Sequence, residues 1–338
     1  MKICMNKKAK TGGLGAARQK NVIRFFALCS IATLFGALFG VTLAACAKKT
    51  AGDADAANIV HFSALNGPTA IPAVFLIDKT FLIENKVGDF TVEISASPDL
   101  LIPRLLNGEI NMGILPVNTA AKMFNTDKNS IVLAATVGEG MLYVMTSDKT
   151  VKTLDDLRGK HIYAAGKGAT PEYIMRSIAP HIELDFSLPQ NEIAPSLLAG
   201  KIDYALLPEP FCTTIEIKNP AFFRALDIQA FTQRYPMSAL VVNAAFAKAH
   251  PESVRNFLAL YQSVIAQTND DPKKTGELAE RYAIGFSAEV TEKAIPYAAF
   301  RYTDGKEMQT LCETLFGIFL QQSPESIANT MPENAFYF

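Results

Sequence analysis

The sequence predicts an α/β protein of two similar lobes, because one stretch of the chain occurs twice. Residues 102–118, IPRLLNGEINMGILPVN, and residues 194–210, APSLLAGKIDYALLPEP, share 7 of 17 positions at a shift of 92 residues. Such self-similarity indicates two copies of one structural unit. In each copy an apolar helical run ends at a glycine, an alternating strand follows, and a proline ends the strand. The alternative is that Leu-Leu-x-Gly is a common sequence wherever a helix leads into a buried strand.

The residues that follow the two repeated strands are the first candidates for a ligand site. Open α/β sheets bind ligands just beyond the carboxyl ends of their strands. These positions hold Asn118 and Thr119 in the first copy, and Glu209 and Phe211 in the second. Glu209 lies between two prolines, which restrict the backbone. This placement suits a carboxylate that contacts a ligand, and it also suits an ordinary exposed turn.

The first 45 residues are typical of a secretory signal. Residues 1–24 contain seven Lys and Arg and no acidic residue, and residues 25–45 carry no charge. Small residues precede Cys46, as in a bacterial lipobox, so we expect Cys46 to become the lipid-modified first residue. An uncleaved membrane anchor and an ordinary cleavage site beside a chance cysteine are the alternatives. Residues 46–58 contain few bulky apolar residues and are expected to form the lipid anchor and a flexible tether.

The remaining part of the chain is long enough for two ordinary domains, at roughly 280 residues. We expect a first lobe at 59–146, a second lobe at 147–237, and a return to the first lobe at 238–338. The formal net charge of −1 gives no electrostatic reason to expect binding to nucleic acid. Beyond Cys46 only Cys212 and Cys312 remain, and because they fall in different predicted lobes we expect two buried free thiols.

The first lobe is predicted to begin with a strand, a turn and a helix. A strand at 59–65 leads through Asn66 and Gly67 into a helix at 70–81, and this loop lacks the ending of a phosphate-binding loop. Further strands are expected at 90–95, 131–137 and 141–146. Gly140 and Met141 belong to the tight turn before the last of these strands. The polar residues 147–153 are expected to carry the chain into the second lobe.

The second lobe contains the clearest predicted helix start, at Thr170. We expect a short helix at 153–160, a strand at 161–165, and then a helix with Thr170 as N-cap and Pro171 as its first residue. The preceding loop, which includes Gly168 and Ala169, would then present backbone N–H groups to an anion. A helix that is merely well capped explains the same residues.

The C-terminal part is predicted to be largely helical. A loop at 231–237, which contains Tyr235, precedes a strand at 238–243 that returns to the first lobe. Helices at 251–268 and 306–321 carry apolar residues on one face, and such faces usually pack into a core.

Taken together, these features resemble the type II periplasmic binding proteins of ABC importers. The resemblance rests on the lipobox, on LLNGEINMGILPVN, on TLDDLRGKHIYAAGKGATPEYIMR and on GKIDYALLPEPF, and it covers roughly residues 59–270. The chain is most similar to the sulfonate, taurine, nitrate and thiamine-pyrimidine branch, which includes NMT1/THI5-like proteins. The resemblance implies a mixed, mostly parallel sheet flanked by helices in each lobe, with a ligand cleft between lobes that close by hinge motion.

The resemblance also assigns, by position, the residues that would face this cleft. They are Asn66, Gly67, Asn118, Thr119, Gly140, Met141, Gly168, Ala169, Thr170, Glu209, Phe211 and Tyr235. Members that hold flat heteroaromatic ligands often stack them on rings that include Trp, and this chain contains no Trp. A flavin or pyrimidine ligand is therefore less favoured, although Tyr173, Tyr235 and Phe211 remain available.

The expected function is capture of a small organic or anionic solute, sulfonate-, taurine- or nitrate-like or thiamine-pyrimidine-like, without chemistry. The solute would be delivered to the permease and ATPase subunits of an importer by a monomer held on the extracytoplasmic face by lipid on Cys46. No enzyme, cofactor or metal is expected, because the histidines show no metal-ligand spacing and no nucleophile elbow occurs. A surface lipoprotein that senses or adheres without transport is the alternative.

Overall fold

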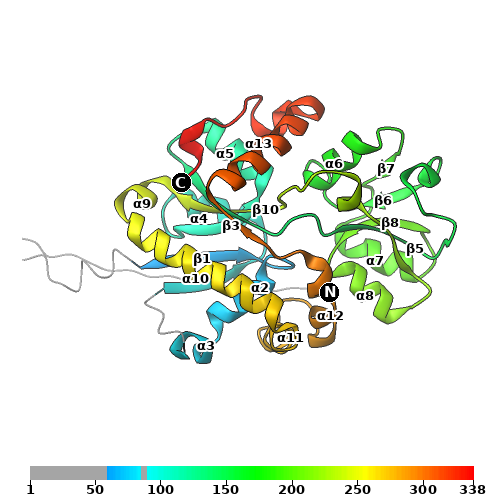
Figure 1. Cartoon of the computed structure of the whole chain (residues 1–338), viewed down its shortest axis with the longest axis horizontal. Coiled ribbons are helices and arrows are strands. Elements are labelled where there is room, and N and C mark those ends of the chain that lie inside the picture. The colour runs from blue at the N-terminus through cyan, green and yellow to red at the C-terminus, as the bar shows by residue number, and fades with distance from the viewer. Residues whose placement is uncertain (1–58, 85–89) are drawn as a thin grey trace, which may run out of the picture. The chain divides into compact units, whose positions relative to one another are not determined.

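The computed structural model describes residues 59–84 and 90–338, which form two β-sheets with helices on both faces of each (Figure 1). The described residues belong to one compact unit. The predicted signal peptide, Cys46 and the tether lie outside the described residues. Within the described ranges, no helix combines the length and the apolar character that a membrane span requires.

The first sheet has the strand order β11-β4-β10-β3-β1-β2. Its strands are β1 (Val60–Leu65), β2 (Phe90–Ser95), β3 (Met112–Pro116), β4 (Ile131–Val137), β10 (Ser238–Asn243) and β11 (Tyr302–Thr303). Strand β1 pairs parallel with β2 and β3, whereas β10 pairs antiparallel with β3 and β4, and β11 antiparallel with β4. Strands β1 to β4 therefore run in one direction, and β10 and β11 run in the other.

The second sheet has the strand order β7-β6-β8-β5-β9. Its strands are β5 (Leu142–Thr146), β6 (Ile162–Ala164), β7 (Leu184–Asp185), β8 (Tyr204–Pro208) and β9 (Phe223–Asp227). Strand β6 pairs parallel with β7 and β8, and β5 pairs antiparallel with β8 and β9. Only β5 runs against the other four strands. Both sheets are therefore mixed, which confirms the predicted two-lobed α/β class, but five of the nine strand pairings are antiparallel, so the sheets are not mostly parallel as we expected.

The chain passes from the first sheet to the second earlier than we expected. We placed this crossing at 147–153 and assigned the strand at 141–146 to the first lobe. Strand β5 instead pairs with β8 and β9, so the crossing occurs at residues 138–141. Every residue of β5 is buried, as suits the interior of a sheet. The polar residues that follow mark the point where β5 reaches the surface, and they do not mark a change of lobe.

Two layers of helices enclose the first sheet. On one face lie α2 (Ala70–Ile77), α9 (Ala244–Ala249), α10 (Pro251–Asp270), α11 (Pro272–Arg281) and α12 (Ala288–Ala298), and on the other α4 (Pro98–Leu106), α5 (Val117–Thr126) and α13 (Gly305–Gln322). Side chains of β10 alternate between the two faces of the sheet. Leu240 and Val242 pack against the first group of helices, and Ala239 and Val241 pack against the second. The predicted helix at 70–81 is interrupted, since Asp78 has an extended backbone before the short α3 (Lys79–Glu84).

Helices also cover both faces of the second sheet. α7 (Gln190–Leu198) and α8 (Phe211–Lys218) pack on one face, beside β8 (Figure 1), and α6 (Thr170–Ile178) packs on the other. The core under α6 continues into the core under α5 and α13, where the rings of Tyr173 and Phe319 lie 5.3 Å apart. Short 3-10 helices occur at η1 (Leu154–Leu157), η2 (Ile228–Phe231), η3 (Pro324–Ile327) and η4 (Asn334–Phe336).

The two copies of the sequence repeat fold alike. Helices α4 and α7 each contain an internal proline, and each is followed by a glycine with positive φ, +80° at Gly108 and +66° at Gly200. Strands β3 and β8 follow and each ends in proline; α5 begins directly after β3, and α8 begins after Glu209 and Pro210. The repeated unit is therefore helix, glycine turn, strand and helix. Cys212 and Cys312 are both free and buried, as predicted.

Candidate functional site

The loops beyond β3 and β6 meet directly, which joins the two lobes at predicted site residues. Asn118 Nδ2 in the first turn of α5 donates a hydrogen bond to the Gly168 carbonyl at 3.1 Å. A carbonyl only accepts, so the amide nitrogen of Asn118 must face it, and Oδ1 is left as an acceptor. Asn118 is 8% exposed, and its Oδ1 is buried without a hydrogen-bond partner among the described residues.

A cavity of about 600 Å³ opens beside this contact, and we call it the α5 pocket. Three predicted residues line it, namely Asn118, Thr119 and Gly168. The other lining residues come from α4, α5 and the turn that follows it, the start of α6 and the η3 turn, and they include Tyr173 and Ser326. Ser326 is 7% exposed, and its Oγ is a second buried polar atom without a partner in the described part of the chain. Both lobes therefore contribute residues to one cavity, and two of these residues also carry a buried polar atom without a partner in the described part of the chain.

Two N–H groups at the glycine loop before α6, those of Gly168 and Ala169, are already bonded within the protein and are not free for an anion as we expected. The Gly168 N–H donates to Glu172 Oε2 at 2.7 Å, and the Ala169 N–H donates to the Gly166 carbonyl at 3.1 Å. Ala169 is the N-cap, and Thr170, which we predicted as N-cap, is the first helical residue and is buried. Glu172 in the first turn thus turns back onto the loop and already supplies a carboxylate at this helix start.

The carboxylate of Glu209 is likewise bound by the protein itself. Glu209 is fully buried, which rules out the exposed turn that we considered. Its Oε1 accepts from Arg224 Nε at 2.6 Å, and its Oε2 accepts from Thr213 Oγ1 at 2.9 Å. Burial raises the pKa of the Glu209 carboxyl above its ordinary value, and the charge of Arg224 opposes that rise. Both oxygens have donors, so Glu209 presents no free acceptor to a ligand.

Three further predicted residues belong to the two segments that cross between the sheets. Gly140 and Met141 both have positive φ, +58° and +55°, and the Gly140 N–H donates to the Tyr235 carbonyl at 3.2 Å. The Met141 carbonyl accepts from the Glu209 N–H at 3.0 Å. Tyr235 is 2% exposed, and its hydroxyl is buried without a partner in the described ranges. These residues link the crossings to each other and to the Glu209 loop.

An ion pair that sequence reasoning missed joins the same two crossings. Glu139 lies in the turn of the first crossing and is 4% exposed, and Arg234 lies in the second. Arg234 Nε and Nη2 each donate to one oxygen of Glu139, both at 2.6 Å. The sequence predicted only a tight turn at 138–140. No local pattern could show that Glu139 pairs with Arg234, because the two residues lie far apart in the chain.

Asn66, Gly67 and Phe211 do not line the α5 pocket. Asn66 is exposed at the end of β1, where its N–H donates to the Ser95 carbonyl at 2.8 Å, and Gly67 follows with φ +106°. The ring of Phe211 lies 5.6 Å from that of Phe286, edge to face. This contact joins the start of α8 to the loop before α12.

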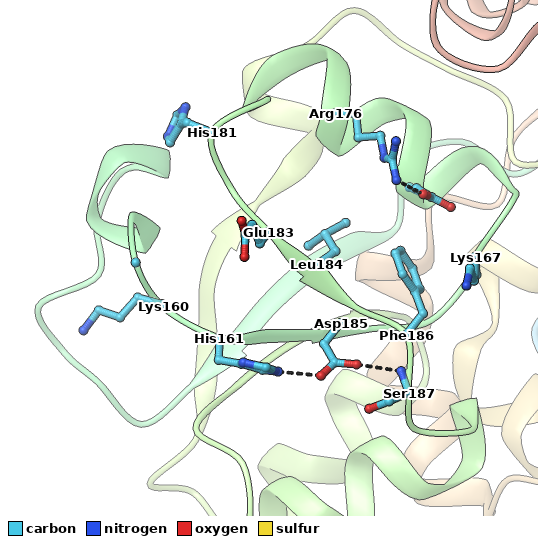
Figure 2. Close-up of a pocket in the computed structure, with 12 residues that line it drawn as sticks. Lys160, His161, Lys167, Arg176, His181, Glu183, Leu184, Asp185, Phe186 and Ser187 are labelled. Atoms are coloured by element: carbon cyan, nitrogen blue, oxygen red, sulfur yellow. Dashed lines mark hydrogen bonds and ion pairs between the residues drawn. The ribbon is translucent and has the colours of Figure 1, made fainter.

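Figure 2 shows a different hollow, of about 860 Å³, that lies entirely in the second lobe. Two pairs of its lining side chains contact each other: His161 with Asp185 at 2.5 Å, and Arg176 with Glu172 at 2.5 Å. Only one lobe lines this hollow, so closure of the lobes would not complete it. Among the described residues, no group of three or more His, Cys, Asp or Glu side chains is placed to hold a metal ion.

Two mixed sheets joined by two crossings, with loops meeting at their carboxyl ends, define the two-lobed fold of type II periplasmic binding proteins. A solved ABC transporter structure from Parabacteroides distasonis has a TM-score of 0.71 at 22% identity, over 83% of this chain and 98% of that one. The aliphatic sulphonate binding protein SsuA of Escherichia coli gives 0.65 at 12% identity, over 78% and 92%. The nitrate-binding protein NrtA of Synechocystis gives 0.57 at 10% identity, over 80% and 84%.

The family model described as NMT1/THI5 like matches residues 90–275. The chain therefore belongs to the NMT1/THI5-like family, as its sequence motifs predicted. Comparison with curated proteins returned no match. The family and the binding proteins above are not enzymes, which agrees with the expectation from the sequence.

Proposed function

We propose that this chain is an extracytoplasmic solute-binding protein of an ABC importer, which captures a small solute between its lobes and delivers it to the permease. The observation that carries this proposal is the α5 pocket, because residues after β3 and residues after β6 line one cavity. A solute held there would contact both lobes at once, and it would favour the arrangement in which Asn118 contacts Gly168. The fold supports the same role, since solved binding proteins for sulfonate and nitrate share it.

The first test is binding of solute by the full chain. Native mass spectrometry of freshly purified protein would be followed by a thermal-shift screen of sulfonates, taurine, nitrate, pyrimidines and flavins. A ligand at a hundred times its dissociation constant adds about 2.7 kcal/mol of stability, which corresponds to roughly 4–5 °C for a protein of this size. A bound mass or such a shift supports solute capture. If no compound and no co-purified mass is found, the solute-binding role is refuted in favour of a lipoprotein that senses or adheres.

We further propose that lipid on Cys46 holds the protein at the membrane. The supporting features are the basic and apolar leader and the small residues before Cys46. Cells that express Cys46→Ser should release the protein from the membrane fraction, whereas Cys29→Ser, a matched change within the leader, should not. Retention of the Cys46→Ser variant in membranes would argue for an uncleaved anchor instead.

A further inference from the structure

We propose that Glu209 positions Arg224 of the second lobe against the ring of Tyr297 in the first lobe, and that this contact sets the angle between the lobes. The sequence marked Glu209 as a candidate ligand contact, but both of its oxygens accept from donors of the second lobe. Its position therefore requires another explanation. We call the cluster that includes Glu209, Thr213, Glu216, Arg224 and Tyr297 the Arg224 brace.

The second lobe fixes the Arg224 side chain through three acceptors. Nε donates to Glu209 Oε1 and Nη2 to Thr213 Oγ1, both at 2.6 Å, and Nη1 donates to Glu216 Oε2. The side chain of Arg224 is 12% exposed, whereas Glu209 is fully buried. A planar guanidinium held at all three of its nitrogens keeps one orientation. The second lobe thus presents an oriented cation at its boundary with the first lobe.

An aromatic ring of the first lobe covers this cation. The Cζ atom of Arg224 lies 4.0 Å from the centre of the Tyr297 ring, which is a cation–π contact. Tyr297 belongs to α12, which packs against α8 on one side, while its buried residues Ile295 and Ala298 join the core of the first lobe (Figure 1). The Tyr143 hydroxyl of the second lobe donates to the Tyr297 carbonyl at 2.9 Å. Tyr297 therefore receives two contacts from the other lobe.

The Tyr297 ring lies outside the cores of both lobes. It is 47% exposed, and it borders a cavity of about 610 Å³ that lies between α8 and α12. A half-exposed ring contributes little to the packing of its own lobe. A substitution at Tyr297 therefore tests the contact with Arg224 while it leaves both cores intact.

The Arg224 brace lies beside the first crossing, where a small movement has a large effect. The residue after α12, Ala299, accepts through its carbonyl from the Glu139 N–H of this crossing at 3.2 Å. Tyr143 is the second residue of β5, which leaves the same crossing. A rotation about the crossings moves Arg224 a short way across the Tyr297 ring, and it moves the far ends of the lobes much further. A contact at this point therefore controls the angle between the lobes.

The Arg224 brace and the α5 pocket share no residue, so the brace can affect a solute only through the lobes. For a solute that binds one arrangement of the lobes, the apparent affinity falls in proportion to the fraction of molecules in that arrangement. This consequence rests on the proposed function. The contact itself does not, and it can be tested without any solute.

The distance between the lobes is the direct measurement. Spin labels would be attached to Asn256→Cys in α10 and to Lys201→Cys before β8, because both positions are exposed and lie in different lobes. The two cysteines of the described residues are buried. The full chain would carry serine at the other three, which are Cys4, Cys29 and Cys46. Double electron–electron resonance then gives the distribution of distances between the labels.

The ring and its partners predict an ordered series of variants. Tyr297→Leu should raise the population outside the main distance, relative to the main peak, by about three- to tenfold, the range that a partly desolvated cation–π contact implies. Tyr297→Phe keeps the ring and should match the unchanged protein. Glu209→Gln should shift the distribution in the same direction as Tyr297→Leu, because Arg224 loses its buried anion. Combining Glu209→Gln with Tyr297→Leu should add little, since both act through one contact.

Phe338→Leu is the matched control. Arg255 lies over the Phe338 ring at 5.9 Å, and Phe338 is 39% exposed, but both residues belong to the first lobe. Its loss should leave the distance distribution unchanged. Each variant would first be shown to unfold cooperatively. If Glu209→Gln does not, the comparison of Tyr297→Leu with Tyr297→Phe still decides the proposal, because Tyr297 lies outside the cores.

Three results would overturn the inference. They are an unchanged distribution in Tyr297→Leu, an equal shift in Tyr297→Phe, and an equal shift in Phe338→Leu. The screen under Proposed function separates this failure from a wider one. Solute binding together with an unchanged distance in Tyr297→Leu refutes the Arg224 brace alone, whereas absence of solute binding leaves the distance result to stand by itself.

Discussion

The ion pair between Glu139 and Arg234 joins both crossing segments, and its removal should destabilise the protein in an asymmetric way. Arg234 contacts both oxygens of Glu139 at 2.6 Å. The side chain of Glu139 is 5% exposed, whereas that of Arg234 is 37% exposed. The two partners therefore lose different amounts of hydration, and this difference decides which substitution costs more.

The expected cost follows from what each substitution leaves behind. Removing one partner of a buried pair costs about 3–5 kcal/mol, and an exposed pair contributes about 0–1 kcal/mol. Arg234→Gln leaves Glu139 buried, with Thr303 Oγ1 at 3.2 Å and Arg301 Nε at 3.7 Å, so we expect a loss of about 2–3 kcal/mol. Glu139→Gln leaves Arg234 near solvent and paired with Glu307 at 2.7 Å, so we expect about 1–2 kcal/mol.

Urea denaturation of the full chain measures both costs and their coupling. The double substitution should cost less than the sum of the single ones, by about 1–2 kcal/mol, since the two side chains are in direct contact. Arg255→Gln is the control, because Arg255 and Glu252 form an exposed pair within α10, and its cost should stay below about 0.5 kcal/mol. The reasoning is wrong if Arg234→Gln costs no more than this control, or if the two single effects simply add.

Two further predictions concern the backbone of the first crossing and a carboxylate of the second lobe. Gly140→Ala should lower the free energy of unfolding by about 1–3 kcal/mol, as measured by thermal denaturation, because φ is +58° and a Cβ would lie 2.6 Å from Gln229 Oε1. Gly108→Ala is the control: φ is +80° but the space around a Cβ is open, so the loss should be only about 1 kcal/mol. Asp185 should titrate at about 2 in a carboxyl NMR titration, since its hydrogen bonds from Ser187 lower the pKa. Its contribution to stability is present above the ordinary value of 3.8 and is lost as the pH falls towards 2, and a pKa at or above 3.8 would contradict the contact.

Features governed by local backbone chemistry were predictable from the sequence. The repeated unit was recognised from its shared residues, and it folds alike because Gly108 and Gly200 adopt positive φ after a helix and a proline ends each strand. The amphipathic pattern of α10 also matched its buried face. The first crossing was misplaced because the pattern of a fully buried strand does not specify which sheet contains it. β5 is such a strand, and only its pairing with β8 and β9 shows where it belongs.

The candidate site was predictable where topology alone places a residue. Asn118 and Gly168 follow strands of different sheets, and the structure brings them together. The sequence did not predict which of their polar atoms are hydrogen-bonded within the protein. The bond from the Gly168 N–H to Glu172, for example, depends on the backbone conformation of the turn before α6. Ser326 comes from the far end of the chain, and no local signal connects it with α5. The spacing of Asn118, Lys122 and Thr126 along one face of α5 was a usable signal that we did not apply.

The α5 pocket lies where the two lobes meet, and this position decides how a solute could act on them. Some contacts between the lobes are satisfied within the protein, such as that of the Tyr143 hydroxyl, which donates to the Tyr297 carbonyl at 2.9 Å, whereas the Tyr235 hydroxyl is buried without a partner in the described ranges. At the α5 pocket, Asn118 Oδ1 and Ser326 Oγ remain buried without partners in the described ranges. Each such atom costs about 1–3 kcal/mol, and water can satisfy Asn118 Oδ1 again if the lobes separate. A solute in the α5 pocket would contact residues of both lobes only while the lobes stay together, so binding and closure would favour each other.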